Sequence, residues 1–417
     1  MLISPWVDVA YLTFAAVSIF MSFLFFLLYA RNRKSLHLSS MLSTLPSISI
    51  IVPTFNEKLT IAGTLEALLK LDYPKEKLET IVVDDGSTDG TSEVAKRFPR
   101  IRLIRKKNGG KASAFNAGLA VSKGELVACV DSDSRPARDS LLKIIPFFSD
   151  PKVAAVTTSI FVREAHNIIQ RLQRIEYLMI VWARKLLEFM DSVYVTPGPL
   201  SVYRASVLKQ LGGFDEKNLT EDIEIAWRLM HAGYSIKMAS DAEVFTSAPS
   251  TFRNWWRQRM RWNIGGMQTT VKYKASLFRR GFGALGTFVI PFFSASYMLS
   301  ILGLFVFAYV IIKMLSDFAA VSWLAFGAGT NPLYYGNFML LPDVFSVFGV
   351  MIFTLSLAWI AISLREVGKG IGGLRALPDL LLYLVVYITV FPFNLLHSSV
   401  RFLAGDSHDW KRYSGVS

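Results

Sequence analysis

Long apolar runs lie at both ends of the chain and enclose a middle part with a different pattern. Residues 9–29 are apolar throughout and long enough to cross a membrane as a helix. Similar runs follow at about 285–312, 344–363 and 377–397. From residue 46 to about 273, charged residues return and short apolar runs alternate with segments of helical periodicity. The pattern predicts a water-exposed domain between membrane helices.

The middle part alternates predicted strands with predicted helices. Strands are expected at 47–52, 80–83, 101–104 and 126–130, and helices at 61–71, 91–98 and 112–120. Strands that alternate with helices of this length are typical of βαβ units and a parallel sheet. We therefore predict an α/β domain of Rossmann-like type over residues 46–275.

Two later segments of this domain are expected to be helices at the membrane surface. Residues 168–190 place apolar side chains at helical spacing among basic ones, and residues 251–273 mix tryptophan with arginine. Basic amphipathic helices and Trp–Arg mixtures both favour the interface between lipid and water. For the first segment, ordinary packing against the core of the domain fits the pattern equally well.

The basic residues set the expected topology. They directly follow the first apolar run at 31–34, which indicates a retained membrane helix with its C-terminal end inside the cell. The connector 315–342 has no Lys or Arg and is expected outside. The last run, 377–397, has basic residues on both sides and contains Asp379 and Pro392. We favour three spans with this run in the interface, because a fourth span would place the basic tail outside.

Composition supports a membrane protein. Of the 417 residues 52% are hydrophobic, and the formal net charge is +13. Many basic residues flank apolar segments and do not form one stripe, so we expect no nucleic acid as a partner. The expected domains are an N-terminal membrane helix in 1–34, the α/β domain in 46–275 and a membrane and interface region in 282–417.

Polar side chains follow three of the predicted strands. Asp131 and Asp133 come after one apolar run, Asp84 and Asp85 after another, and the sequence PTFNE occupies 53–57. Each could be an ordinary polar turn, but the carboxyl ends of parallel strands meet at one edge, where ligands bind. Two carboxylates separated by one residue suit Mg²⁺ or Mn²⁺, held together with substrate phosphates.

Two further motifs open predicted helices. Lys111 follows the pair Gly109 and Gly110, an arrangement whose backbone N–H groups and ammonium suit phosphate, or else an exposed basic loop. Glu221 and Asp222 follow a threonine that can cap a helix, and acids in a first helical turn are stabilising in any protein. The functional hypothesis is that Asp222 acts as a general base for a hydroxyl group.

A final motif lies on the second expected interface helix. Gln258, Arg261 and Trp262 have the spacing i, i+3, i+4 and so share one helix face. An arginine beside a flat aromatic ring can hold a diphosphate and stack on a sugar. The alternative is a helix that is simply anchored in the interface by Arg and Trp.

The order of these motifs resembles that of the inverting family 2 glycosyltransferases. In chain order they read PTFNE, DDGS, GKA, DSD, GPLSVYR, TED and QRMRW, between about residues 47 and 266. They are most similar to the membrane-embedded processive synthases of hyaluronan, chitin, cellulose and poly-N-acetylglucosamine. The resemblance implies a GT-A-type catalytic domain on the cytosolic face of the cell membrane, a UDP-sugar donor, and Mg²⁺ or Mn²⁺ as cofactor.

The resemblance also implies roles for single residues. The residues implied to hold the nucleotide and its diphosphate are Thr54, Glu57, Asp84, Asp85, Lys111, Asp131, Asp133 and Arg261. Of these, Asp131 and Asp133 are implied to bind the metal. Asp222 is the implied base, with Glu221 beside it. The residues implied to hold the acceptor are Gly198, Gln258 and Trp262. Trp410 and Arg412 in the tail resemble a gating segment that closes over the nucleotide.

The implied activity is transfer of a sugar, with N-acetylglucosamine as first choice, to the end of a β-linked polysaccharide. Direct displacement needs one base and a stabilised leaving group, and no enzymic nucleophile. The expected partners are the growing glycan or a lipid acceptor, and membrane lipids. Larger relatives have more spans, so a homo-oligomeric pore, or a glycolipid or short product, stays open. A catalytically inactive membrane scaffold is a third hypothesis, against which the intact acidic motifs argue.

Overall fold

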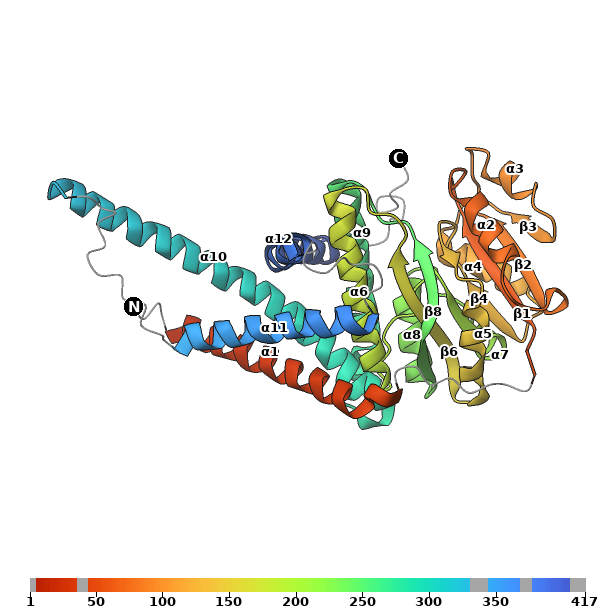
Figure 1. Cartoon of the computed structure of the whole chain (residues 1–417), viewed down its shortest axis with the longest axis horizontal. Helices are drawn as coiled ribbons and strands as arrows, with labels where there is room; N and C mark the ends of the chain where they lie inside the picture. The colour runs from red at the N-terminus through yellow and green to blue at the C-terminus, as the bar shows by residue number, and fades with distance from the viewer. Residues whose placement is uncertain (1–4, 36–43, 331–343, 368–376, 406–417) are drawn as a thin grey trace.

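The chain folds into an α/β domain joined to a set of long helices (Figure 1). The computed structural model describes residues 5–35, 44–330, 344–367 and 377–405. The α/β domain lies at one end, α6 (Ile168–Glu188) and α9 (Phe252–Lys272) stand beside it, and long apolar helices extend away from it. The predicted gating residues Trp410 and Arg412 lie outside the described residues.

An eight-stranded sheet, in the order β3-β2-β1-β4-β7-β6-β8-β5, forms the α/β domain. Its strands are β1 (Ile48–Thr54), β2 (Leu78–Asp84), β3 (Ile101–Arg105), β4 (Leu126–Cys129), β5 (Arg135–Pro136), β6 (Val153–Val162), β7 (Ser201–Arg204) and β8 (Ser235–Thr246). The strands β1 to β4 are parallel, as the sequence predicts. Beyond them, β7 is antiparallel to both neighbours, which makes the sheet mixed.

Different helices cover the two faces of the sheet. They are α2 (Ile61–Leu69), α3 (Thr91–Ala95), α4 (Lys111–Val121), α5 (Ser140–Ile144), α7 (Ala205–Gln210) and α8 (Glu221–His231). Side chains alternate along a strand, so Ile50 and Val52 of β1 pack with residues of α2 and α5, whereas Ile51 packs with α4 and α8. Burial on both faces explains why β1 is a continuous apolar run.

The strand order brings the three predicted polar ends to one edge of the sheet. β1 lies between β2 and β4, with Thr54 paired to Asp84 and Ile51 paired to Cys129. The chain segments after Thr54, Asp84 and Cys129 therefore leave the sheet side by side. This part of the sequence prediction is confirmed.

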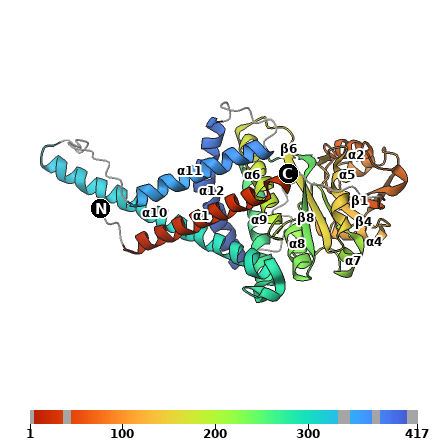
Figure 2. The same ribbon diagram turned by 60° about the horizontal axis from the view of Figure 1, so that its bottom comes forward.

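Among the described residues, four helices are long and apolar enough to cross a membrane: α1 (Pro5–Asn32), α10 (Ile290–Gly327), α11 (Val344–Val367) and α12 (Leu377–Leu403). In both ribbon views α1, α10 and α11 extend away from the α/β domain (Figures 1 and 2). The Tyr29 hydroxyl donates to the Glu366 carboxylate at 2.6 Å, which joins the domain-side ends of α1 and α11. The basic residues that follow α1 therefore lie on the same side as the α/β domain.

The helix α12 runs across the other three long helices. It is seen nearly end-on in Figure 1 and crosswise in Figure 2, and it packs on α6 and α9. The Asn394 amide accepts from Asn263 at 3.0 Å and donates to the main-chain carbonyl of Trp256 at 3.0 Å. This direction agrees with the predicted interfacial position, although length and composition alone would allow α12 to cross the membrane.

The helix α10 is longer than the predicted span. It continues for 38 residues, from Ile290 to Gly327, because neither Gly nor Pro interrupts residues 304–326. Lys313 also pairs with Asp317 one turn later, at 2.8 Å. At 1.5 Å per residue the helix is about 57 Å long, against about 30 Å for a bilayer core. The first part of the connector predicted outside is therefore helical.

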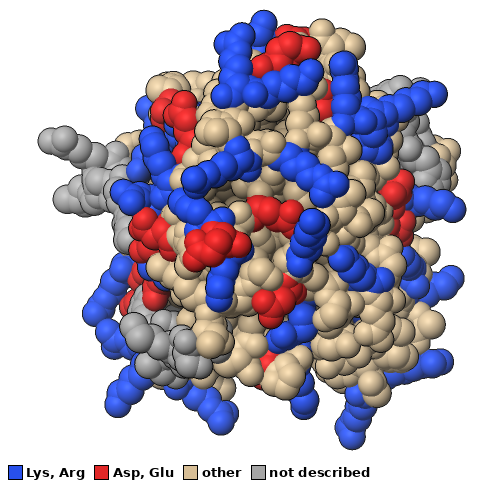
Figure 3. All heavy atoms as spheres, turned by 90° about the vertical axis from the view of Figure 1, so that its right-hand side faces the viewer, with Lys and Arg blue, Asp and Glu red and all other residues tan. Residues whose placement is uncertain are grey.

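The end of the α/β domain that faces away from the long helices carries mixed charge (Figure 3). Lys and Arg side chains are spread over this face, with Asp and Glu among them. On this face the positive charge is therefore distributed and is not gathered into one stripe.

Candidate active site

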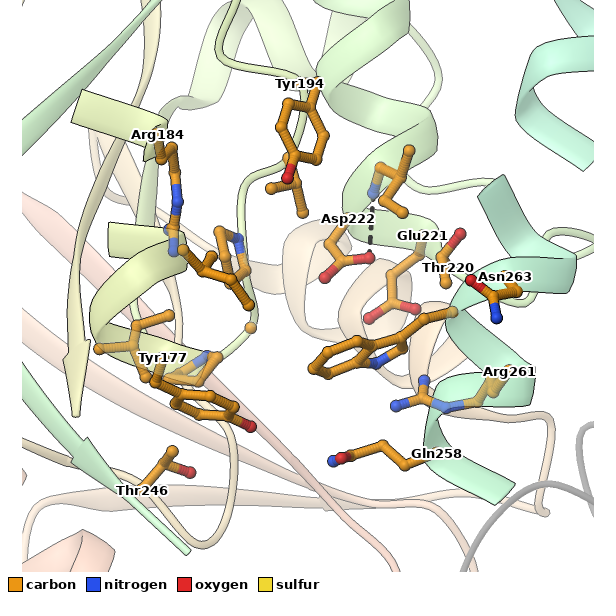
Figure 4. Close-up of a pocket in the computed structure, with 18 of the residues that line it drawn as sticks. Tyr177, Arg184, Tyr194, Thr220, Glu221, Asp222, Thr246, Gln258, Arg261 and Asn263 are labelled. Carbon is orange, nitrogen blue, oxygen red and sulfur yellow. Dashed lines mark hydrogen bonds between the residues drawn. The ribbon is translucent and has the colours of Figure 1, made fainter. Parts of the chain in front are cut away.

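A cavity of about 420 Å³ lies between the α/β domain, α8, α9 and the first turns of α10 (Figure 4). Its polar wall holds nine of the predicted site residues: Lys111, Asp131, Asp133, Gly198, Glu221, Asp222, Gln258, Arg261 and Trp262. Its apolar wall comes from α10 and α12 and includes Phe292, Phe293, Tyr297, Phe391 and Leu395. One cavity therefore connects the predicted catalytic groups with the long apolar helices.

Lys111 and Asp131 form an ion pair in this cavity. The Lys111 Nζ lies 2.5 Å from Asp131 Oδ1 and 3.3 Å from Glu221 Oε1. Burial acts to lower the pKa of Lys111, but the two carboxylates outweigh it and raise the pKa well above its ordinary value. The lysine is therefore a permanent cation.

Gly198 lies directly against this ion pair. Its carbonyl accepts from the Asp131 N–H at 3.0 Å. A Cβ at Gly198 would lie 2.4 Å from both Asp131 Oδ1 and Lys111 Nζ, so only glycine allows this approach. Gly198, which is predicted to contact the acceptor, therefore also leaves the space that the Lys111–Asp131 ion pair occupies.

Asp133 completes the acidic pair at the end of β4. Its carboxylate accepts from the hydroxyls of Ser134 at 3.1 Å and Thr246 at 3.2 Å. Burial raises the pKa of Asp133, and the charge of Asp131 adds to the rise. The described residues contain no cluster of three or more His, Cys, Asp or Glu that could hold a metal alone. The pair therefore fits a cation such as Mg²⁺, whose other ligands are substrate phosphates and water.

Asp222 and Glu221 form the first turn of α8, and Asp222 faces into the cavity (Figure 4). The Asp222 carbonyl accepts from the N–H and hydroxyl of Thr196, at 3.2 and 3.0 Å, which fixes the start of the helix. Burial raises the pKa of Asp222 to about 6, and the charge of Glu221 adds to the rise, whereas Lys111 opposes it. A carboxyl group with such a pKa is suited to accept a proton near neutral pH.

Two of the predicted nucleoside-binding residues, Thr54 at the end of β1 and Glu57 just after it, lie outside the lining of the cavity. The Thr54 hydroxyl is buried and has no hydrogen-bond partner among the described residues. Glu57 accepts from the Thr60 hydroxyl at 2.5 Å. Burial raises the pKa of Glu57 to about 7, and the charges of Asp133 and Asp131 contribute, which places Glu57 near the acidic pair.

The other two predicted nucleoside-binding residues, Asp84 and Asp85, stabilise loops at this edge of the sheet. Asp84 is fully buried and accepts from the Ser87 N–H at 2.8 Å and from the Ser92 hydroxyl. Burial acts to raise the pKa of Asp84, but these hydrogen bonds outweigh it and lower the pKa below its ordinary value. A nucleoside contact for Asp84 stays a prediction.

The Asp85 carboxylate holds the loop that precedes α4. It accepts from Lys106 Nζ at 2.7 Å, from the Gly109 N–H at 3.0 Å and from the Gly110 N–H at 2.7 Å. The sequence analysis considered phosphate for these two glycine N–H groups, with an exposed basic loop as the alternative; in the structure both groups donate to Asp85. Lys111 remains as the group of this motif that faces the cavity.

Arg259, which the sequence analysis did not single out, ties α9 to α6. Its guanidinium forms a buried ion pair with Glu176, with Nε 3.0 Å from Oε1, and lies 4.1 Å from the centre of the Trp262 ring. It also donates to the Gln258 side chain at 2.5 Å. Arg259 therefore positions both predicted acceptor-binding side chains of α9.

Further polar residues of the cavity were also missed: Tyr177, Arg184, Tyr194, Thr246 and Asn263. Thr246 was detectable in principle, because it ends a strand as the predicted residues do. The side chains on α6 gave no such signal. A basic amphipathic helix does not reveal which of its cations turns toward a ligand cavity.

An α/β sheet with an acidic pair, an ion-paired lysine and a carboxylate-bearing helix at its strand ends is the architecture of the GT-A-type glycosyltransferases. Residues 49–212 match the family model described as Glycosyl transferase family 2. This segment of the chain is therefore similar to the family 2 glycosyltransferases, in agreement with the predicted resemblance.

Two curated relatives share about a third of their aligned residues with this chain. The Bacillus subtilis protein named "Probable glycosyltransferase YdaM" is 32% identical over 246 residues, which cover 56% of this chain and 59% of that protein. The poly-beta-1,6-N-acetyl-D-glucosamine synthase of Staphylococcus epidermidis is 31% identical over 254 residues, which cover 60% of this chain and 61% of that protein. The chain thus matches about three fifths of the length of these relatives.

A solved structure has a similar fold. It is a mannosyltransferase from Pyrobaculum calidifontis in complex with GDP-Man and Mn²⁺, with a TM-score of 0.59 and 22% sequence identity. The similarity covers 95% of this chain and 99% of that one. The predicted GT-A-type α/β fold with additional helical segments is confirmed.

Proposed function

We propose that the protein is a membrane-integrated inverting glycosyltransferase that moves a sugar from a UDP-sugar to a hydroxyl group of a glycan or lipid. The observation that supports this most is the joint cavity, which places Asp222 beside Lys111 and Asp131 and opposite Arg261. N-acetylglucosamine is the first candidate sugar, because the Staphylococcus relative is named as a synthase of its polymer.

In the proposed reaction Asp222 is the base. The acceptor oxygen attacks C1 of the donor sugar on the face opposite the diphosphate, and its proton passes to the Asp222 carboxylate. The bond between C1 and the diphosphate oxygen breaks, and its electron pair leaves with UDP. A single displacement inverts the configuration at C1, so an α-linked donor gives a β-linked product.

The cations of the cavity would stabilise the leaving group. Lys111 and Arg261 both line the cavity and would contact the diphosphate. Asp131 and Asp133 would hold Mg²⁺ or Mn²⁺, which supplies neutralisation of the developing phosphate charge when bound. Thr54, Glu57, Asp84 and Asp85 would contact the nucleoside, with Thr54 offering an unpartnered hydroxyl.

The acceptor would lie on the α9 side of the cavity. Trp262 offers a flat face for a sugar ring, and Gln258 and Gly198 line the same space. Processive extension of a β-glycan is the first candidate outcome. The apolar wall formed by α10 and α12 favours a second one, the transfer of a sugar to a lipid.

The catalytic domain would lie in the cytosol and be held at the cell membrane. The basic residues 31–34 follow α1 on the side of the α/β domain, and the positive-inside rule assigns that side to the cytosol. UDP-sugars are made in the cytosol, so this orientation gives the site access to its donor.

The full chain, purified in detergent with Mg²⁺ or Mn²⁺, tests the proposal against a panel of UDP- and GDP-sugars. We expect one UDP-sugar to be consumed, with UDP released and a β-linked product found by mass spectrometry. Asp222→Asn should lower turnover by about 10²–10⁴-fold with donor binding retained, because it removes only the base. Unchanged turnover in this variant would show that the base lies elsewhere.

A further inference from the structure

Arg184 is a buried cation of the cavity for which the described residues supply no ion-pair partner. Its side chain is 3% exposed, and it donates to the Thr157 hydroxyl at 3.1 Å and to the Thr158 carbonyl at 3.4 Å. Its Nε has no partner within the described part of the chain, where no ion pair includes this arginine. The next residue, Lys185, is also buried but pairs with Glu188 at 2.7 Å.

A guanidinium without a direct ion-pair partner is costly to bury. Charges inside proteins are normally paired, because a hydroxyl and a carbonyl replace only part of the lost hydration. Burial lowers the pKa of Arg184 to about 10, although Tyr194 and the Asp222 carboxylate act to raise it, so the side chain still carries its charge at neutral pH. A positive charge kept in a ligand cavity at this cost is a site for an anionic group.

The position of Arg184 separates it from the cations that face the donor. In Figure 4 it lies across the cavity from Arg261, with Asp222 and Glu221 between them. Tyr194 lies on the same side of the cavity in this view and interacts electrostatically with Arg184. The anion that binds here is therefore distinct from the diphosphate and belongs to the second substrate.

The remainder of this side of the cavity is apolar. The Tyr194 ring packs edge-on against Phe293 of α10, with centroids 4.8 Å apart. Phe292 of α10 and Phe391 and Leu395 of α12 continue the lining. Both helices are among the four that are apolar enough to cross a membrane. The cavity wall beside Arg184 is therefore suited to contact the hydrocarbon chain of a lipid.

We propose that the acceptor is an anionic lipid, whose phosphate binds Arg184, whose head-group hydroxyl reaches Asp222 and whose hydrocarbon contacts α10 and α12. The proposal rests on the proposed function, since it uses Asp222 as the base. The hydroxyl oxygen bonds to C1 of the sugar, its proton goes to Asp222, and the nucleoside diphosphate leaves. The lipid phosphate is unchanged, and the product is a glycosylated anionic lipid.

A binding experiment with the full chain in neutral detergent tests the lipid site without any donor. The probes are dioleoylphosphatidylglycerol, dioleoylglycerol, glycerol 1-phosphate and a glucuronate-containing trisaccharide, with affinities measured by native mass spectrometry. We expect the phospholipid to bind about tenfold more tightly than each of the others, because only it combines charge with hydrocarbon. Arg184→Gln should remove this preference, and Arg184→Lys should retain part of it.

Two variants separate binding from folding. Arg171→Gln on the same helix removes an arginine that is half exposed and pairs with Asp379 at 3.1 Å, so phospholipid binding should not change. Tyr194→Phe keeps the ring on Phe293 and removes the hydroxyl that interacts electrostatically with Arg184, and should weaken phospholipid binding by a few fold. Equal binding of phospholipid and dioleoylglycerol would overturn the proposal, as would tighter binding of the trisaccharide.

Transfer assays distinguish failure of this inference from failure of the proposed function. If Asp222-dependent transfer occurs on a neutral β-glycan primer and Arg184→Gln leaves it unchanged, the proposed function stands and the lipid acceptor is wrong. If the phospholipid binds in an Arg184-dependent way but no sugar nucleotide is turned over, the binding site stands and the proposed reaction is wrong.

Discussion

At the scale of single residues, the proposed site works through charges that modify one another. Asp222 is adjacent to Glu221, and Lys111 lies 3.3 Å from Glu221 and 2.5 Å from Asp131. Removing one carboxylate therefore changes the proton affinity of the next. Because these charges are coupled, removing one of them should shift the pH dependence of transfer, and a variant that only loses activity would not show this shift.

The first prediction concerns the pH dependence of transfer. Since burial and Glu221 raise the pKa of Asp222 to about 6, kcat/KM should rise with pH through that value as Asp222 loses its proton. Glu221→Gln removes one of the negative charges that raise this pKa, so the rise should move to lower pH by up to about one unit. The pH–rate profiles of the unsubstituted protein and of Glu221→Gln measure this shift. A rise at the same pH in both proteins would contradict the coupling.

The second prediction concerns Gly198. Gly198→Ala would place a methyl group 2.4 Å from both charged atoms of the Lys111–Asp131 pair, so the pair must separate. We expect transfer to fall by about 10²-fold or more, since displacements of about 1 Å in an active site have such effects. Gly281→Ala is the matched control, because its Cβ would meet nothing within 4 Å. Equal activity of the two variants would show that the close approach is unimportant.

At the scale of elements, α9 acts as a support between the α/β domain and the long helices. It packs on α8 and α12, and Arg259 joins it to α6 through Glu176. The same guanidinium lies over the Trp262 ring, so the contact between helices also sets the geometry of the cavity. Stability and acceptor binding should therefore change together when this contact is altered.

The third prediction tests that contact by a double-mutant cycle. Arg259→Met leaves the buried Glu176 charge unpaired and should lower the free energy of unfolding by about 3–5 kcal/mol. Adding Glu176→Leu removes the stranded charge and should recover much of this loss. Arg253→Met, at an exposed position of the same helix, serves as control. Thermal unfolding in detergent measures the effect, and purely additive losses would argue against a coupled pair.

At the scale of the whole molecule, the direction of α12 decides on which side the tail lies. Helices α1, α10 and α11 extend away from the domain, whereas α12 runs across them and packs on α6 and α9 (Figures 1 and 2). With three spans the tail lies on the side of the catalytic domain, where the predicted gating residues Trp410 and Arg412 could act on the nucleotide. With four spans they could not.

The fourth prediction places single cysteines in intact cells. Cys129 is buried, so added cysteines report alone. With a membrane-impermeant maleimide we expect Thr330→Cys, after the far end of α10, to be labelled, and Lys34→Cys and Gly405→Cys to be labelled only after lysis. Labelling of Gly405→Cys in intact cells would mean that α12 crosses the membrane.

The sequence by itself determined those features that local pattern encodes. The strands β1 and β4 are buried, largely apolar runs because helices cover both of their faces, and the polar residues at the ends of β1, β2 and β4 mark their carboxyl ends. The predicted charges of Asp131, Asp133, Asp222 and Lys111 do share one cavity. Hydrophobic length likewise predicted the long helices, since a spanning helix needs only a sufficient run of apolar residues.

Only the tertiary structure decided which side chains meet. It gave the Gly109 and Gly110 N–H groups to Asp85, paired Arg259 with Glu176, and turned Arg184 into the cavity without an acidic partner. It also set α12 across the other long helices. These outcomes depend on packing between segments far apart in the sequence, and an amphipathic pattern does not specify which distant residue will face each position of a helix.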